Sequence, residues 1–151
     1  MFKEQGYYKK ISSSKAFLNC QRDLLEGTAG IEISADKTSN GIYTNTDSRF
    51  NGVTIIPPVF IGKNVSIKSG SIINSGVVIE DNVSIESYVS IDNSYIGENS
   101  IINDNCKIDS SIICENSLLN KNIICEKDSY IGENVKIGNN SRIKSKMNIN
   151  S

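Results

Sequence analysis

The side chains able to do chemistry in this 151-residue chain are carboxylates, hydroxyls and four thiols, because histidine is absent. Without histidine, no side chain has an ordinary pKa near neutrality and can serve as a general base. Serines are frequent, but none has an adjacent base to activate it as a nucleophile. We interpret the carboxylate runs Glu80-Asp81 and Glu126 to Asp128 as solvated surface. The sequence therefore predicts no catalytic residue, no metal site and no cofactor.

The cysteines and the net charge indicate in which compartment the protein works and which classes of partner it lacks. The thiols belong to Cys20, Cys106, Cys114 and Cys125, and no two of them form a CxxC pair. We interpret them as reduced structural thiols of a cytoplasmic protein. The net charge of −1 gives no electrostatic case for a nucleic acid or an acidic membrane as partner. No apolar run approaches the ~18 residues of a membrane-spanning helix.

A six-residue repeat runs through residues 55–149, and the elements that it forms must position any functional site. The interval shortens to five twice, before Ile96 and before Ile113. The position two before each repeating residue is small or β-branched, and the position three after is mostly Asn or Gly, which tolerate the positive φ of a tight corner. The repeating residues are Ile55, Ile61, Ile67, Ile73, Ile79, Ile85, Ile91, Ile96, Ile102, Ile108, Ile113, Leu119, Cys125, Ile131, Ile137, Ile143 and Ile149.

This period predicts an all-β fold, a parallel β-helix of about five coils. Residues i−2 and i of a strand point to the same side, so each unit is a short strand followed by a corner. Three units make one triangular coil, and stacked coils bury the aliphatic column. We expect two domains: residues 1–41 as an N-terminal helix and linker, and residues 42–151 as the β-helix. The helix is predicted over about residues 14–26 and ends at Gly27.

One outer face of the predicted β-helix carries an apolar stripe. The residue before each inward aliphatic points outward, and every third unit selects one face. On that face the outward residues are Phe60, Val78, Tyr95, Ile112 and Tyr130. A contiguous apolar patch usually marks an interface, so we predict that these five residues contact another protein molecule. Coverage by the helix or the 28–50 segment of the same molecule is the alternative.

Several segments resemble sugar-phosphate nucleotidyltransferases, such as glucose-1-phosphate thymidylyltransferases and mannose-1-phosphate guanylyltransferases. Residues 6–14 (GYYKKISSS) and 16–27 (AFLNCQRDLLEG) are similar to the end of that family's catalytic domain. Residues 56–62 (IPPVFIG) and 93–99 (NSYIGEN) resemble its C-terminal hexapeptide β-helix. The resemblance implies left-handed coils, one short N-terminal helix, and oligomer contacts made by the β-helix.

The sequence departs from this family where catalysis is expected. The family's nucleotide-binding domain, with its G-x-G-[ST]-R-x-x-P loop, is not found in these 151 residues. Lys10 lies where the family has a metal-binding Asp, and Tyr8 and Ser12 replace a Trp and a Gly. A cation at that position argues against metal-assisted phosphoryl transfer. Other hexapeptide proteins are acyltransferases or γ-class carbonic anhydrases, and both use histidines that this protein lacks.

We therefore predict a non-catalytic assembly or regulatory module related to nucleotide-sugar biosynthesis. Its expected partner is another copy of itself (a homo-oligomer), a separate nucleotidyltransferase catalytic subunit, or both. One alternative is the C-terminal half of a split sugar-1-phosphate nucleotidyltransferase, active only with a separate catalytic subunit. The other is a free-standing oligomeric scaffold. If the protein belongs to an enzyme, the resemblance favours a nucleotidyltransferase over an acyltransferase.

Overall fold

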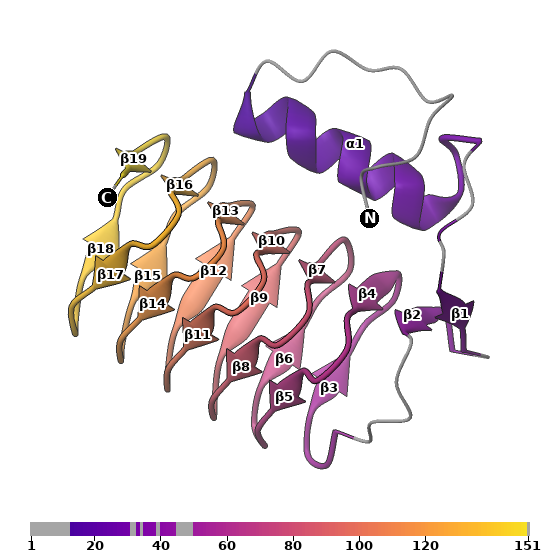
Figure 1. Cartoon of the computed structure of the whole chain (residues 1–151), viewed down its shortest axis with the longest axis horizontal. Helices are drawn as coiled ribbons and strands as arrows, with labels where there is room; N and C mark the ends of the chain where they lie inside the picture. Colours follow the sequence, from indigo (N-terminus) through magenta and orange to yellow (C-terminus); the bar gives the residue numbers. More distant parts are fainter. Residues whose placement is uncertain (1–12, 31–32, 34, 39, 45–49, 151) are drawn as a thin grey trace.

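In the part of the chain that the structure describes, three sheets of short strands wrap into a triangular prism, with one helix beside it (Figure 1). The computed structural model describes residues 13–150 except 31, 32, 34, 39 and 45–49. The first sheet contains, in order, β1 (Asp36–Lys37), β2 (Ile42–Thr44), β4 (Val59–Ile61), β7 (Val78–Ile79), β10 (Tyr95–Ile96), β13 (Ile112–Ile113), β16 (Tyr130–Ile131) and β19 (Asn148–Ile149). The second sheet contains β3 (Thr54–Ile55), β6 (Ile72–Ile73), β9 (Ser90–Asp92), β12 (Lys107–Asp109), β15 (Ile124–Cys125) and β18 (Arg142–Ile143). The third sheet contains β5 (Ser66–Ile67), β8 (Ser84–Ile85), β11 (Ile101–Ile102), β14 (Leu118–Leu119) and β17 (Lys136–Ile137).

The order of the strands confirms the predicted parallel β-helix. From β4 onward, successive strands fall on the first, third and second sheets in turn, so strands of one sheet are neighbours one coil apart. Their pairing is parallel, as in Tyr95 with Ile112 and Ile101 with Leu118. The stack has about six turns, against about five predicted, because β2 pairs with β4 and adds a strand before the regular repeat that begins at Ile55. At the start of the first sheet, β1 adds an antiparallel strand that the sequence did not predict.

The repeating aliphatic residues form the core inside the prism. Ile61, Ile79, Ile96, Ile113 and Ile131 are fully buried, and the corresponding columns of the other two sheets join the same cluster. Several serines lie at the small positions and are also buried. Their hydroxyls donate to backbone carbonyls of the neighbouring coil, and this offsets the cost of burying a polar group. Two such bonds join Ser71 Oγ to Glu86 O at 2.7 Å and Ser117 Oγ to Gly132 O at 2.9 Å.

Corner residues adopt the positive φ that the repeat requires. The asparagines in this conformation are Asn64, Asn82, Asn93, Asn99, Asn105, Asn116, Asn122, Asn134 and Asn140. Tyr88 is an exception to the preference for Gly and Asn, with φ of 58° and 68% of its surface exposed. Its ring lies over Gly70 of the preceding coil, where a Cβ atom would come within 2.5 Å of the ring. Gly70 therefore leaves the space that this tyrosine occupies.

Helix α1 (Ser14–Glu26) has the predicted bounds and ends. Ser13 is the N-cap, and its side chain accepts a hydrogen bond from Ala16 N. Gly27 ends the helix with φ of 79°, a left-handed conformation that glycine adopts without strain. The buried residues of the helix are Leu18, Cys20, Gln21, Leu24 and Leu25. No helix among the described residues is both long and apolar enough to cross a membrane.

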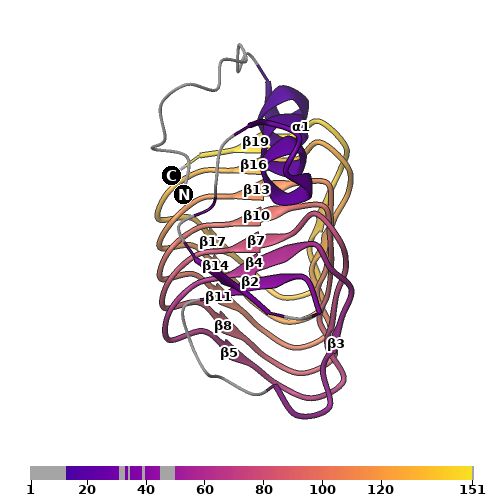
Figure 2. The same cartoon turned by 90° about the vertical axis from the view of Figure 1, so that its right-hand side faces the viewer.

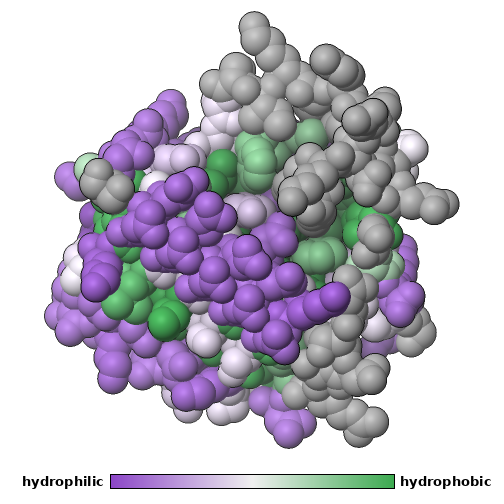
Figure 3. Space-filling view, viewed as in Figure 1, coloured by the Kyte–Doolittle hydropathy of each residue, from purple (hydrophilic) through white to green (hydrophobic). Residues whose placement is uncertain are grey.

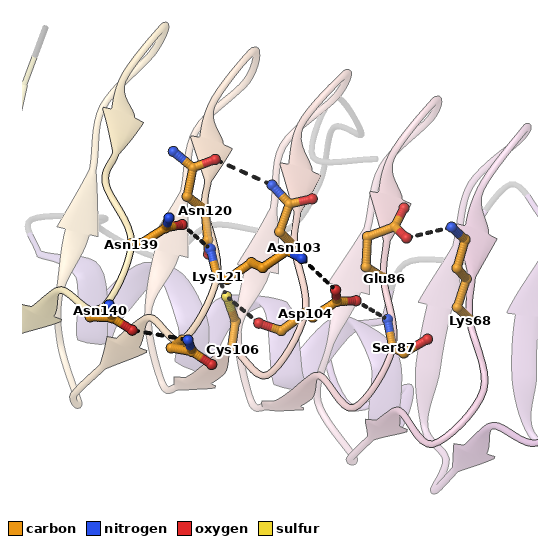
Figure 4. A network of polar contacts seen from close by, with 11 residues as sticks. Lys68, Glu86, Ser87, Asn103, Asp104, Cys106, Asn120, Lys121, Asn139 and Asn140 are labelled. Atoms are coloured by element: carbon orange, nitrogen blue, oxygen red, sulfur yellow. Dashed lines mark hydrogen bonds and ion pairs between the residues drawn. The ribbon is translucent and has the colours of Figure 1, made fainter.

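The corner between the third and second sheets carries a network of polar contacts between coils (Figure 4). Asp104 accepts a hydrogen bond from Ser87 N at 3.0 Å and pairs with Lys121 Nζ at 3.4 Å. Asn103 Nδ2 donates to Asn120 Oδ1 at 3.4 Å. Figure 3 shows a continuous hydrophilic band across one side of the molecule, flanked by smaller hydrophobic patches. The contacts of this corner join successive coils, so we assign them to stability.

We expect Asp104→Ala to lower the free energy of unfolding by about 1–2 kcal/mol, because the N–H of Ser87 loses its acceptor. Asp104→Asn keeps an oxygen for that N–H and loses only the exposed ion pair with Lys121, so its loss should be at most about 0.5 kcal/mol. Urea denaturation followed by circular dichroism measures both variants. Equal losses would show that the ion pair, and not the hydrogen bond, stabilises this corner.

Candidate functional site

The apolar stripe is a straight column across the first sheet. Phe60 pairs with Val78, Val78 with Tyr95, Tyr95 with Ile112, and Ile112 with Tyr130. The sequence spacing therefore places one stripe residue on each successive coil. Phe60, Val78 and Ile112 are buried, with 8%, 0% and 6% of their surface exposed, and the two tyrosines are half-buried.

Helix α1 lies along the first sheet (Figures 1 and 2) and its side chains contact this stripe. Leu25, near the end of the helix, forms one buried cluster with Phe60 and Val78. Phe17, two turns earlier, meets Tyr95 edge to face, with ring centroids 5.4 Å apart and planes at 84°. The helix thus runs in the direction opposite to the advance of the coils.

Two polar side chains fix the helix on the sheet. Gln21 is fully buried, and its Nε2 donates to Gly76 O at 2.8 Å and to Ser94 O at 3.0 Å. It therefore joins the corners of two successive coils. Arg22 Nη2 donates to Asn93 Oδ1 at 3.0 Å. Among the buried side-chain nitrogens and oxygens of the described residues, Gln21 Oε1 alone has no hydrogen-bond partner.

These contacts decide how much of the stripe is available to another molecule. The sequence left two occupants open, another protein molecule or a segment of the same one. In the structure α1 of the same molecule contacts Phe60, Val78 and Tyr95. Contact of the stripe with another molecule stays a prediction. Lys10, predicted to replace the metal-binding Asp of the nucleotidyltransferases, lies outside the described residues.

Titratable side chains lie in the stripe and beside it. Tyr95 and Tyr130 belong to the stripe, and Glu80 and Cys114 directly follow β7 and β13 of the first sheet. Glu80 and Tyr95 share a hydrogen bond, and burial raises the pKa of both groups. Tyr130 shares a hydrogen bond with Cys114, which raises the pKa of the phenol to about 12. Burial raises the pKa of the Cys114 thiol as well. The phenols and the thiol therefore stay protonated at neutral pH, which makes Cys114 a weak nucleophile.

The thiol of Cys114 gives a prediction with a defined sign. The O–H of Tyr130 stabilises the thiolate and lowers its pKa, whereas burial raises that pKa by more. We expect alkylation of Cys114 by iodoacetamide to accelerate at a higher pH than that of a free thiol, near ~8.5. Tyr130→Phe should move the rate profile to still higher pH. Mass spectrometry of the alkylated site at each pH measures it, and a shift to lower pH would contradict the assigned hydrogen bond.

The other cysteines serve packing. All four thiols are free, and Cys106 and Cys125 lie inside the prism at inward positions of the repeat. Burial raises the pKa of Cys125 to about 12, with Cys106 beside it as a smaller cause. Within the described part of the protein, no three His, Cys, Asp or Glu side chains gather closely enough to hold a metal ion.

Gln21 and Arg22 are the site residues that sequence reasoning missed. The sequence predicted the bounds of α1 and left its position on the β-helix undefined. One signal was present: Gln21 lies between Phe17 and Leu25, four residues from each, and so on the same side of the helix. A polar residue in the middle of an apolar face requires a buried partner, and here backbone carbonyls supply it.

The repeat and its corners also match a known domain family. The profile of the EIF2B subunit epsilon LbH domain, a left-handed β-helix, matches residues 39–145. The chain belongs to this family. The LbH assignment gives the coils their left hand, which the period alone did not determine. It supports the predicted hexapeptide β-helix, and it is coarser than the resemblance to sugar-phosphate nucleotidyltransferases.

Two solved structures are similar to this LbH protein. One is a Bacillus cereus protein assigned to the acetyltransferases, at 19% identity and a TM-score of 0.40 over 66% of each sequence. The other is UDP-N-acetylglucosamine O-acyltransferase (LpxA) of Moraxella catarrhalis, at 18% identity and a TM-score of 0.36 over 66% of this sequence and 56% of that one. This LbH protein thus spans about two thirds of the first relative's length and just over half of the second's. No curated protein matches it. At these identities and TM-scores the likeness carries no conclusion about activity.

Proposed function

We propose that this protein is a non-catalytic assembly or regulatory β-helix, related to the β-helix modules of nucleotidyltransferases and active in nucleotide-sugar biosynthesis. The observation that supports it most is the match of residues 39–145 to an LbH domain named for a subunit, and so for a part of an assembly. The partner is another copy of the protein, a separate cytoplasmic nucleotidyltransferase subunit, or both. The interface includes the stripe of Phe60, Val78, Tyr95, Ile112 and Tyr130 together with the helix that covers it.

The chemistry of the side chains supports a role without catalysis. The sequence has no histidine to act as a general base at neutral pH. The titratable side chains in and beside the stripe have raised pKa values, so the thiol and phenols remain neutral. The corner between the third and second sheets uses its carboxylates and amides in contacts between coils. These groups stabilise the fold.

The experiment that tests the proposal is capture of the full-length protein, at its native level, from the cells that make it, with the bound proteins identified by mass spectrometry. A nucleotidyltransferase catalytic subunit among them supports the regulatory or assembly role. Adding that subunit then separates two cases. If nucleotidyltransferase activity depends on the β-helix, the split-enzyme alternative gains; if activity is present without it and changes when it binds, the regulatory role stands.

Recovery of the bait alone, as a defined oligomer that binds no sugar phosphate, would overturn the nucleotide-sugar role. The free-standing scaffold would then be the remaining interpretation. A monomer that binds no other protein would overturn assembly altogether. The variant Val78→Glu, which places a charge in the stripe and leaves the interior of the prism unchanged, should capture less of the partner if the stripe belongs to the interface.

A further inference from the structure

We propose that α1 (Ser14–Glu26) is an exchangeable cover, which docks on the first sheet of a second copy of this protein as well as on its own. The proposal rests on the proposed function, because exchange of α1 would join two assembly modules through a surface that each already has. The observations that support it are the kind of contact that holds α1, the unpaired oxygen of Gln21, and the backbone that follows the helix.

The described contacts between α1 and the prism are made by side chains of the helix. Among the described residues, no backbone-to-backbone hydrogen bond joins the helix to a strand, whereas the coils are joined by a backbone ladder throughout. The anchors are Leu25 in the Phe60 and Val78 cluster, the ring of Phe17, the amide of Gln21 and the guanidinium of Arg22. A helix held in this way can leave without disturbing the ladder of the β-helix.

The docked position of Gln21 is incompletely satisfied. Its Nε2 has two carbonyl partners, whereas its buried Oε1 has none. Water would satisfy that oxygen when the helix is released, so part of the cost of exposing the stripe is recovered. The two hydrogen bonds of Gln21 thus fix the position of α1 on the sheet, while the unpaired Oε1 makes the docked state less stable than a fully satisfied one.

The end of α1 is closed by hydrogen bonds and is followed by a glycine in open space. The N–H groups of Thr28 and Ala29 both donate to Asp23 O, so these residues close the end of the helix. Gly30 follows with φ of 72°, and an added Cβ atom there would meet nothing within 4 Å. Glycine in open space directly after a closed helix end is suited to act as a hinge.

The occupant of an open first sheet must match what α1 supplies. It needs an apolar side chain for Phe60 and Val78, an aromatic edge for Tyr95, and an amide that donates to the carbonyls of Gly76 and Ser94. The α1 helix of a second copy has all of these at the right spacing. Exchange of an identical element needs no new contact surface, and the tethered α1 competes with it through its high effective concentration.

The test is complementation between two full-length variants, one of them labelled with ¹⁵N. The helix variant carries Gln21→Asp and Leu25→Asp, so its α1 cannot dock while its first sheet stays intact. The sheet variant carries Val78→Glu, so its first sheet rejects a helix while its α1 stays intact. We expect native mass spectrometry of the mixture to show a species of one labelled and one unlabelled molecule, with a mass equal to the sum of the labelled and the unlabelled monomer.

Matched controls use surface positions. Lys15→Glu changes a residue on the outer side of α1 and Ser84→Glu an outward residue of the third sheet, and this pair should form no more mixed species than two wild-type molecules. Circular dichroism of each variant checks that the β-helix is folded, and Phe60→Glu replaces Val78→Glu if it is not. A mixture that contains no mixed-mass species above this control overturns the exchange of α1.

The outcome is separate from that of the proposed function. A wild-type protein that assembles, combined with variants that do not complement, would overturn exchange and leave assembly in place through another surface. Variants that complement, combined with a wild-type protein that neither self-associates nor captures another protein, would support exchange and overturn assembly by the native protein.

Discussion

Gly97→Ala is expected to lower the free energy of unfolding by about 3 kcal/mol, although it adds only one methyl group. A Cβ atom on Gly97 would lie 2.5 Å from the backbone nitrogen of Glu115 and 2.7 Å from the carbonyl carbon of Cys114. Both atoms belong to the next coil, and Gly97 N donates to Ile113 O there at 2.7 Å. The methyl group can be accommodated only if the ladder between β10 and β13 opens.

Gly138→Ala is the matched control. Gly138 also follows an inward isoleucine, in the third sheet, and an added Cβ atom there would meet nothing within 4 Å. Its φ is not in the left-handed region, so alanine should be neutral or stabilise by at most about 1 kcal/mol through the unfolded state. Urea denaturation followed by circular dichroism measures both variants. A loss of similar size at both positions would contradict the assigned contact between coils.

The close approach of Gly97 to the next coil explains why small residues recur beside the stripe in the sequence. The positions beside the stripe are mostly small, with Gly62, Gly97 and Gly132 on alternate coils. The structure places each of them against the next coil: a Cβ atom on Gly62 would collide with Asp81 Oδ1, and one on Gly132 would lie 2.8 Å from Asn150 Oδ1. The glycines therefore serve close packing of the coils.

The repeating part of the fold could be predicted because one period specifies it. Once Ile61, Ile79 and Ile96 point inward, their outward neighbours must stack, and the asparagines must take the corners. The five-residue spacings at Ile96 and Ile113 did not break the pattern, since each drops one residue at a corner and keeps the strands in register. Periodicity therefore predicted the sheets, the core and the stripe together.

The site could not be predicted in the same way, because α1 occurs once and obeys no period. Its position depends on Gln21 reaching two carbonyls and on Phe17 meeting Tyr95, which are contacts between residues far apart in the sequence. Helix propensity and caps predicted the bounds of α1 and not the face that it covers. For the same reason β1 was missed: its pairing with β2 is the antiparallel exception in a parallel sheet.

Ile102→Ala is expected to lower the free energy of unfolding by about 2–5 kcal/mol, the range for deleting a fully buried aliphatic side chain. Ile102 has 0% of its surface exposed and lies on β11, the central strand of the third sheet, where the coils on either side prevent collapse into the cavity. Its neighbour Ile101, on the same strand, points outward and has 42% of its surface exposed. Ile101→Ala should therefore cost less than about 1 kcal/mol. Because one strand carries both residues, the difference between them measures the register of the repeat directly. If the two variants unfold at the same urea concentration, the inward assignment of the whole aliphatic column is wrong, since a slip by one residue would exchange the two faces of every strand.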